Sequence, residues 1–253
     1  MVAPNGRTLT EAAGQSGRVE YYHNHAWQAF EERFLDGDEQ LQRVCQNVWS
    51  PRYIDAMVLR DACDPATGAI ILPERLFYLA DANYNVTGLV REHPQNPGRW
   101  QIVERSVYDP YGRATLLQAD WSKTLGPDGQ PGTPDDGTTS NFATTTLYTG
   151  RTLDLESGLY HYRARHYHPL LSTFTARDPI GYWSSDANLY RYVRNQPVLL
   201  MDPSGHVDYG YVHLEGASYG KAPQVPVGHE WAQLGKAVSE KTNNTSAEVL
   251  AAQ

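Results

Sequence analysis

The sequence predicts a mainly β fold, made of antiparallel hairpin repeats and followed by a short helical C-terminal tail. Three observations support this prediction. The 253 residues include 17 tyrosines and 6 tryptophans, and aromatic rings suit the half-buried, pleated surface of a sheet. The 21 glycines and 16 prolines suit many tight turns, because these residues adopt the backbone angles that turns require. Apolar and polar residues also alternate along short segments, which is the period of a β-strand.

Four segments in the first half of the chain repeat one scheme of strand, turn and strand. In each segment an alternating run is interrupted by Asn, Asp, Pro or Gly, which favour turns. The predicted hairpins are 18–34 with a turn around Asn24, 42–60 broken at Ser50-Pro51, 75–91 turning at 81–85, and 100–117 turning at 108–113. The unit recurs at an irregular spacing of roughly 20 to 30 residues, as in degenerate repeat arrays.

The other segments complete the predicted organisation. Residues 1–17 are expected to be a flexible N-terminus that precedes the β-repeats of residues 18–120. Residues 121–146 are rich in Gly, Pro and Asp, which cannot bury an apolar face, so a flexible insertion is expected there. A core region at 147–206 is followed by a variable tail at 207–253. Trp231, Leu234, Ala237 and Val238 have helical spacing within that tail.

Composition excludes several classes of protein. Lys and Arg number 21 against 29 for Asp and Glu, a net charge of −8, which argues against a nucleic-acid partner. No apolar run is long enough to span a membrane. The N-terminal residues also lack the apolar region of a secretory signal peptide. Cys45 and Cys63 match neither a metal spacing nor a redox motif, so two buried thiols are favoured over a disulfide.

No metal or cofactor site is expected. His166 and His168 would share one face of a strand, a spacing that zinc accepts, but no Cys or carboxylate lies close enough in sequence to complete a site with them and His161. The sequence contains no phosphate-binding loop, dinucleotide fingerprint or nucleophile elbow.

Residues 147–205 carry the most specific pattern in the chain. Two turns of the form Asp-Pro-x-Gly, at 178–181 and 202–205, bracket an aromatic, alternating segment. This block resembles the C-terminal repeat-associated core of Rhs/YD-repeat proteins, and Tyr-Asp-x-x-Gly-Arg at 108–113 resembles the YD signature. The resemblance covers residues 18–205 and implies the end of a YD/Rhs-type β-shell that encloses a toxin or effector.

The two turns place a carboxylate pair within the core. Peptide hydrolysis by such a pair needs one ionised carboxylate to activate water and one protonated carboxyl group to polarise the carbonyl. The resemblance implies that Asp178 and Asp202 form a self-cleaving aspartyl site, with Arg165 as its supporting cation. It places the cleaved bond between His206 and Val207, where His206 stands in place of the leucine that is usual in the family.

Other functions remain open from the sequence. Each Asp-Pro-x-Gly motif is by itself a type I turn, so the core could serve only as a scaffold, or as a decayed structural fragment of a polymorphic toxin. A noncatalytic carbohydrate- or surface-binding β-module is another alternative, with Trp100, Trp121 and Trp183 stacking on sugar rings. A general protease is disfavoured, because a site within a shell meets its own chain at high effective concentration.

The resemblance also implies partners and a location. Preceding Rhs/YD repeats, or another chain, would complete the shell, and a toxin or peptide would be its cargo. The protein would be bacterial, and either cytoplasmic or exported by a dedicated secretion system.

Overall fold

The protein is mainly antiparallel β, as the sequence predicts. The computed structural model describes residues 7–9, 17–51, 53–184, 186–206 and 209–210, which belong to the first of the chain's two units, Met1–Tyr211. The described residues form sheets of nine, four and two strands. The helical tail expected within 207–253 and most of the flexible N-terminus expected at 1–17 lie outside the described residues.

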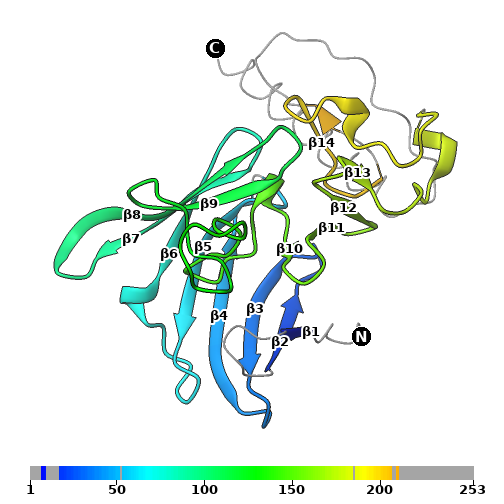
Figure 1. The fold of residues 1–253 in the computed structure, drawn as a ribbon. Coiled ribbons are helices and arrows are strands. Elements are labelled where there is room, and N and C mark those ends of the chain that lie inside the picture. Colours follow the sequence, from blue (N-terminus) through cyan, green and yellow to red (C-terminus); the bar gives the residue numbers. More distant parts are fainter. Residues whose placement is uncertain (1–6, 10–16, 52, 185, 207–208, 211–253) are drawn as a thin grey trace, which may run out of the picture. The chain divides into compact units, whose positions relative to one another are not determined.

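The nine-stranded sheet is built in chain order, each strand pairing with the next (Figure 1). Its strands are β1 (Arg7–Leu9), β2 (Gly17–His23), β3 (Ala29–Leu35), β4 (Leu41–Trp49), β5 (Met57–Cys63), β6 (Leu76–Ala80), β7 (Val86–His93), β8 (Asn96–Tyr108) and β9 (Ala114–Gln118). The four predicted hairpins are confirmed as β2–β3, β4–β5, β6–β7 and β8–β9. Every pairing is antiparallel, because short turns connect consecutive strands.

Four hairpin turns share one hydrogen-bond pattern. The first residue of each turn is Asn or Asp, and its Oδ1 accepts the amides two and four positions later. The residue three positions later has a positive φ. The first residues of these turns are Asn24, Asp36, Asp81 and Asp109. Since an Asx side chain can replace a backbone acceptor in this way, the turn is encoded locally.

The four-stranded sheet contains β10 (Leu153–Asp154), β11 (Leu159–Tyr162), β12 (Arg165–His168) and β13 (Thr173–Phe174), and β14 (Leu200–Met201) pairs with β15 (Tyr209–Gly210). Strand alternation buries one face of this sheet. Six rings there are at most 1% exposed, namely Tyr148, Tyr160, Tyr162, Tyr167, Phe174 and Tyr192. On the other face His161 pairs with His166, with ring centroids 5.4 Å apart. The described residues contain no group of three His, Cys, Asp or Glu that could hold a metal ion.

The turn between β8 and β9 packs against this tyrosine cluster. Three hydroxyls donate to three consecutive carbonyl oxygens of the turn: Tyr148 to Pro110 at 2.9 Å, Tyr167 to Tyr111 at 2.8 Å, and Tyr160 to Gly112 at 3.0 Å. Gly112 has φ +88°, and a Cβ there would overlap the Tyr148 ring. The glycine of this turn is therefore required by both backbone angle and space.

Residues 140–147 lie across one face of the nine-stranded sheet. Buried polar side chains of three strands bind this segment: Arg60 donates to the Phe142 and Ala143 carbonyls, Tyr78 shares a hydrogen bond with Thr144, and Glu104 accepts from Ser140 and Asn141. The amide of Val86 donates to the Leu147 carbonyl at 3.1 Å. The end of the insertion expected at 121–146 is thus attached to the sheet by hydrogen bonds to its side chains.

Both cysteines are free and buried. Cys45 lies opposite Ala62 in the β4–β5 register, so the next residue, Cys63, faces the other side of the sheet. A disulfide between them is therefore geometrically excluded, and the expectation of two buried thiols is confirmed.

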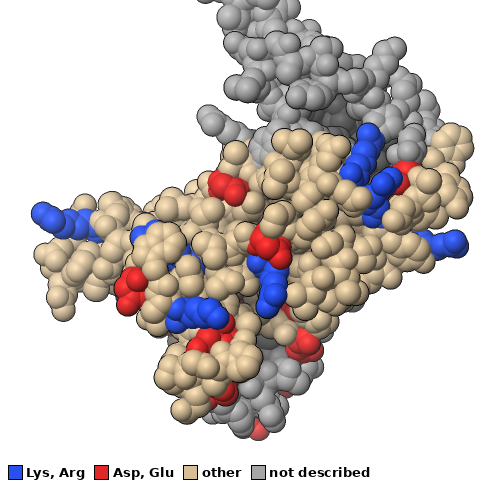
Figure 2. All heavy atoms as spheres, turned by 45° about the horizontal axis from the view of Figure 1, so that its top comes forward, with Lys and Arg blue, Asp and Glu red and all other residues tan. Residues whose placement is uncertain are grey.

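The described surface mixes charges of both signs. Figure 2 shows basic and acidic side chains interspersed on a mostly uncharged face. No described helix has the length and apolar character needed to cross a bilayer.

Candidate functional site

The two predicted Asp-Pro-x-Gly turns meet around Arg165. Its Nη2 lies 3.2 Å from Oδ2 of Asp202 and 3.5 Å from Oδ2 of Asp178. The three residues are 4%, 2% and 8% exposed, respectively. One buried guanidinium therefore joins two carboxylates that are 24 positions apart in the sequence.

In each aspartate the two carboxylate oxygens have different partners. Oδ1 of Asp178 accepts the amide of Ile180 at 3.0 Å, and Oδ1 of Asp202 accepts the amides of Gly205 at 2.8 Å and His206 at 3.1 Å. In both residues the other oxygen, Oδ2, is the one nearest Arg165. One side chain can therefore close its turn through Oδ1 and contact Arg165 through Oδ2.

Arg165 is fixed from several sides. It lies on β12, where alternation directs it to the same buried face as Tyr167. Its Nη1 donates to the Leu189 carbonyl at 3.2 Å, and its guanidinium carbon lies 3.6 Å from the centroid of the Phe174 ring. A cation stacked on a ring and donating to carbonyls has little freedom, so both aspartates meet a preorganised donor.

The turn between β11 and β12 runs along the second Asp-Pro turn. Its residues 163 and 164, and Arg165 at the start of β12, donate hydrogen bonds to the carbonyls of residues 203, 204 and 205, in that order. Gly205 has φ +73°, and a Cβ there would overlap the carbonyl oxygen of Tyr162. This close backbone approach explains why a glycine ends the turn.

Burial and charge act against each other at the pair. Burial raises the pKa of Asp202, while Arg165 and Arg151 oppose that rise. Burial also lowers the pKa of Arg165, and the two aspartates oppose that change. Burial therefore favours the protonated form of Asp202, whereas the two arginines favour its ionised form.

A small cavity adjoins the pair. It has about 30 Å³ of space, and its lining includes Arg165, Asp178, Asp202 and His206. A water molecule requires about 10–15 Å³ by the same measure, so one fits beside the carboxylates. Nδ1 of His206 is buried and lies 3.8 Å from Oδ1 of Asp178.

The structure thus brings together Asp178, Asp202, Arg165 and His206. Val207, predicted to follow the cleaved bond, lies outside the described residues.

A third Asp-Pro-x-Gly motif lies within the segment 108–113, which was predicted as a hairpin turn with a YD-like signature. Asp109-Pro110-Tyr111-Gly112 forms the β8–β9 turn, and its carbonyls accept the three tyrosine hydroxyls. Asp109 is exposed and caps its own turn. The motif alone therefore does not define a reactive pair.

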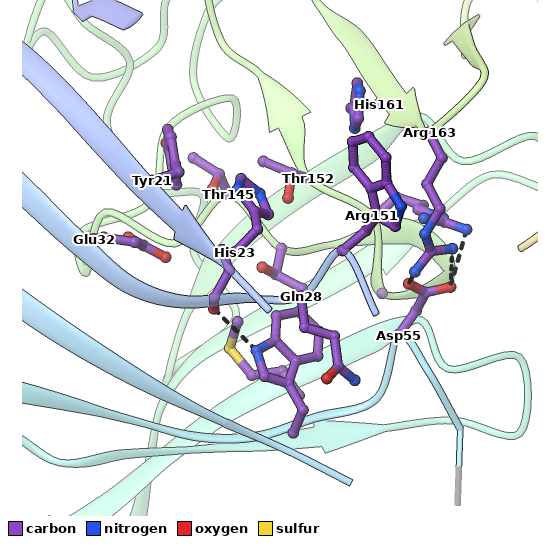
Figure 3. Close-up of a pocket in the computed structure, with 16 residues that line it drawn as sticks. Tyr21, His23, Gln28, Glu32, Asp55, Thr145, Arg151, Thr152, His161 and Arg163 are labelled. Atoms are coloured by element: carbon purple, nitrogen blue, oxygen red, sulfur yellow. Dashed lines mark hydrogen bonds and ion pairs between the residues drawn. The ribbon is translucent and has the colours of Figure 1, made fainter. Parts of the chain in front are cut away.

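Sequence reasoning also missed a second cluster of buried charges. Asp55 lies in the connection between β4 and β5 and binds two arginines, Arg151 at 3.0 Å and Arg163 at 2.6 Å (Figure 3). These side chains help to line a cavity of about 50 Å³. The partners are about a hundred positions apart, so no local spacing could have indicated them.

The three tryptophans considered for sugar binding differ in their surroundings. Trp100 is 57% exposed and packs edge-on with Phe77, while Trp121 is 61% exposed and lies under the guanidinium of Arg105. Trp183 is the most exposed, at 75%. Two of the three rings therefore already have a packing partner.

Solved structures define the class of fold. The crystal structure of TcdB2-TccC3 aligns with 78% of this chain and 8% of its own, at a TM-score of 0.54 and 21% identity. The Photorhabdus luminescens Tc holotoxin pore aligns with 86% of this chain and 10% of its own, at a TM-score of 0.50 and 17% identity. The fold thus resembles a part of the Rhs shell of a Tc toxin.

Curated relatives are similar over parts of the chain. Toxin subunit YenC1 of Yersinia entomophaga is 32% identical over 108 residues, 43% of this chain and 9% of that protein. Toxin protein Tse5 of Pseudomonas aeruginosa is 35% identical over 86 residues, 34% of this chain and 6% of that protein. The uncharacterised protein YibJ of Escherichia coli is 48% identical over 59 residues, 23% of this chain and 24% of that protein.

Over part of its length the chain is thus similar to Rhs-associated toxin proteins. It spans less than a quarter of the length of each of the three relatives named. No protein-family profile matches the chain.

Proposed function

We propose that this chain is the C-terminal core of an Rhs/YD-repeat shell protein, and that it cleaves itself between His206 and Val207. Similarity to Rhs-type toxin subunits and the shell fold support the structural role. The observation that carries the reaction is the meeting of Asp178 and Asp202 at one nitrogen of Arg165.

In the proposed reaction the ionised carboxylate of the pair removes a proton from a water molecule. That water attacks the carbonyl carbon of His206, and the protonated carboxyl group donates its proton to the carbonyl oxygen. Burial favours Asp202 as the protonated member, because it raises the pKa of that residue. Collapse of the tetrahedral intermediate breaks the C–N bond. The proton taken from water passes to the Val207 amine, and one hydroxyl of the intermediate returns its proton to the carboxylate that had donated one, which restores the starting pair.

The position of His206 supports this assignment. Its amide donates to Oδ1 of Asp202, and its side chain lines the cavity beside the pair. The peptide bond that follows His206 therefore belongs to a residue whose own amide is held by Asp202. Arg165 holds the carbonyl of Gly205, which limits movement of the same segment.

Intact-mass spectrometry of the purified full chain tests the reaction. We expect the wild type to yield two fragments that separate after residue 206, and Asp178→Asn and Asp202→Asn to remain whole. Asp109→Asn is the matched control, because it changes the same turn motif away from Arg165, and it should be cleaved like the wild type. An uncut wild type after days at several pH values would remove the self-cleavage proposal.

We further propose that preceding repeats, or another chain, extend the nine-stranded sheet at β1. Among the described strands, β1 pairs only with β2, so its other edge can accept a strand. A toxin or peptide cargo is the proposed content of the completed shell. Co-expression of this chain with the preceding repeats, followed by size-exclusion chromatography, tests the extension, because a complex should elute as one species.

A further inference from the structure

We propose that Asp55 is a positioning residue for the Asp178–Asp202 pair, acting through Arg151 and Arg163 on the turn that carries Asp202. Its role in cleavage rests on the proposed self-cleavage, whereas its role in holding the turn does not. Asp55 lies in the connection between β4 and β5 of the nine-stranded sheet, 147 positions before Asp202.

Asp55 forms a buried ion cluster. It is 4% exposed and accepts two hydrogen bonds from Arg163, with Nη2 to Oδ1 at 2.6 Å and Nη1 to Oδ2 at 3.3 Å. Nη2 of Arg151 lies 3.0 Å from Oδ2 of the same carboxylate. Figure 3 shows both guanidinium groups directed at Asp55. Such forked pairs fix geometry as well as charge.

Both arginines also bind the turn that carries Asp202. Nη1 of Arg163 and Nη2 of Arg151 each donate to the carbonyl oxygen of Pro203, the residue directly after Asp202. Two cationic donors on one carbonyl oxygen locate that peptide group. Asp55 is the carboxylate that holds both donors in place, so its loss would release the turn as well as the cluster.

The backbone reinforces this arrangement. A Cβ on Gly150 would overlap the backbone of Asp55, so the two segments are in direct contact. Gly150 directly precedes Arg151, which also stacks its guanidinium on the Tyr162 ring at 4.9 Å from the centroid. The β4–β5 connection thus sets the position of the residue that reaches the turn.

The cluster also contributes charge at the pair. The titratable and charged groups around Asp202 are Arg165, Asp178, His206, Arg151 and Tyr162. Arg151 opposes the rise in the pKa of Asp202 that burial causes. Asp55 neutralises part of the charge of Arg151 and Arg163. Removing the Asp55 carboxylate should therefore lower the pKa of Asp202, and removing the Arg151 cation should raise it.

Amide hydrogen exchange tests the positioning role without requiring cleavage. The full chain is used with Asp178→Asn, so that it stays intact, and is compared with and without Asp55→Asn. The amides of Gly205 and His206, which both donate to Asp202, should exchange roughly tenfold faster or more. A hydrogen bond to a charged group stabilises the closed state by about a factor of ten or more in its equilibrium constant. The matched control is Asp61→Asn, which breaks a buried carboxylate's 2.6 Å pair with Arg75 elsewhere on the sheet.

Unchanged exchange at 205 and 206 in the Asp55 variant, or an equal increase in the Asp61 variant, would overturn the positioning role. If the wild type is never cleaved and the Asp55 variant still loosens these two amides, the positioning role stands and the self-cleavage proposal fails.

The pH profile of cleavage tests the charge role. In the otherwise wild-type chain, Asp55→Asn should slow cleavage up to about a hundredfold, as displaced catalytic groups do, and move the profile to lower pH. Arg151→Gln should move the profile to higher pH. Opposite shifts cannot arise from loss of structure alone, so shifts of the same sign, or no shift, would overturn the electrostatic part.

Discussion

Gly181 and Gly205 end the two aspartate turns in different surroundings. Both have positive φ, +59° and +73°, but a Cβ on Gly181 meets no other atom within 4 Å, whereas one on Gly205 overlaps the Tyr162 carbonyl. We expect Gly181→Ala to lower the free energy of unfolding by about 1–2 kcal/mol, the usual cost of this backbone region. Gly205→Ala should cost on the order of 3 kcal/mol or more, because the clash adds to that cost.

Urea denaturation of the two variants beside the wild type measures this difference. Equal losses would mean that the second turn is not packed against the β11–β12 turn, and would weaken the geometry of the proposed site. The two glycines are indistinguishable in sequence, since both end an Asp-Pro-x-Gly motif. Only the long-range approach of Tyr162 separates them.

At the scale of an element, β8 carries a carboxyl group that depends on pH. Glu104 is 1% exposed, and burial raises its pKa above the usual value, although it accepts bonds from Ser140 and Asn141. Its folded pKa therefore exceeds its unfolded pKa. The stability that it contributes is present below the unfolded pKa and is lost as the pH rises through the folded pKa.

We therefore expect Glu104→Gln to flatten the dependence of stability on pH. The free energy of unfolding of the wild type minus that of the variant should become smaller between pH 4.5 and pH 7.5. Urea unfolding of both proteins at the two pH values measures it. Asp202 titrates in the same way in both proteins, so its contribution cancels in the difference. A constant difference in the free energy of unfolding between the two proteins would show that Glu104 does not titrate in this range.

The elements also show what sequence could predict. The hairpins were predictable because alternation and the Asx turn are local signals, contained within a few residues of one another. The path of residues 140–147 was not, since Arg60 binds a carbonyl 82 positions away. Asp178, Asp202 and Arg165 were named from a family resemblance, because neither spacing nor turn chemistry brings them together. Asp55 had no such resemblance and no local signal.

At the scale of the whole molecule, three tyrosine hydroxyls connect the two large sheets. Tyr148, Tyr160 and Tyr167 donate to the β8–β9 turn. Replacing all three with Phe should lower the free energy of unfolding by about 0.5–1.5 kcal/mol for each hydrogen bond, because three turn carbonyls lose their donors. We expect amides of β10–β13 to lose more exchange protection than amides of β3–β8.

Tyr78→Phe is the control for this coupling. It removes a buried hydroxyl bond to Thr144 at 2.9 Å without touching the β8–β9 turn. Equal loss of protection in both sheets of the triple variant would mean that the hydroxyls stabilise the fold generally and do not couple its parts.

The aspartate turn has a consequence for how such a site can arise and disappear. A hairpin closed by Asp uses one carboxylate oxygen for its own backbone, as at Asp81 and Asp109. A second oxygen on the same side chain can take on another role without loss of the hairpin. The proposed reactive centre could therefore evolve from two ordinary turns once an arginine lies between them. Loss of that arginine would leave both turns closed by their own aspartates, so related chains could keep the fold without the proposed reaction.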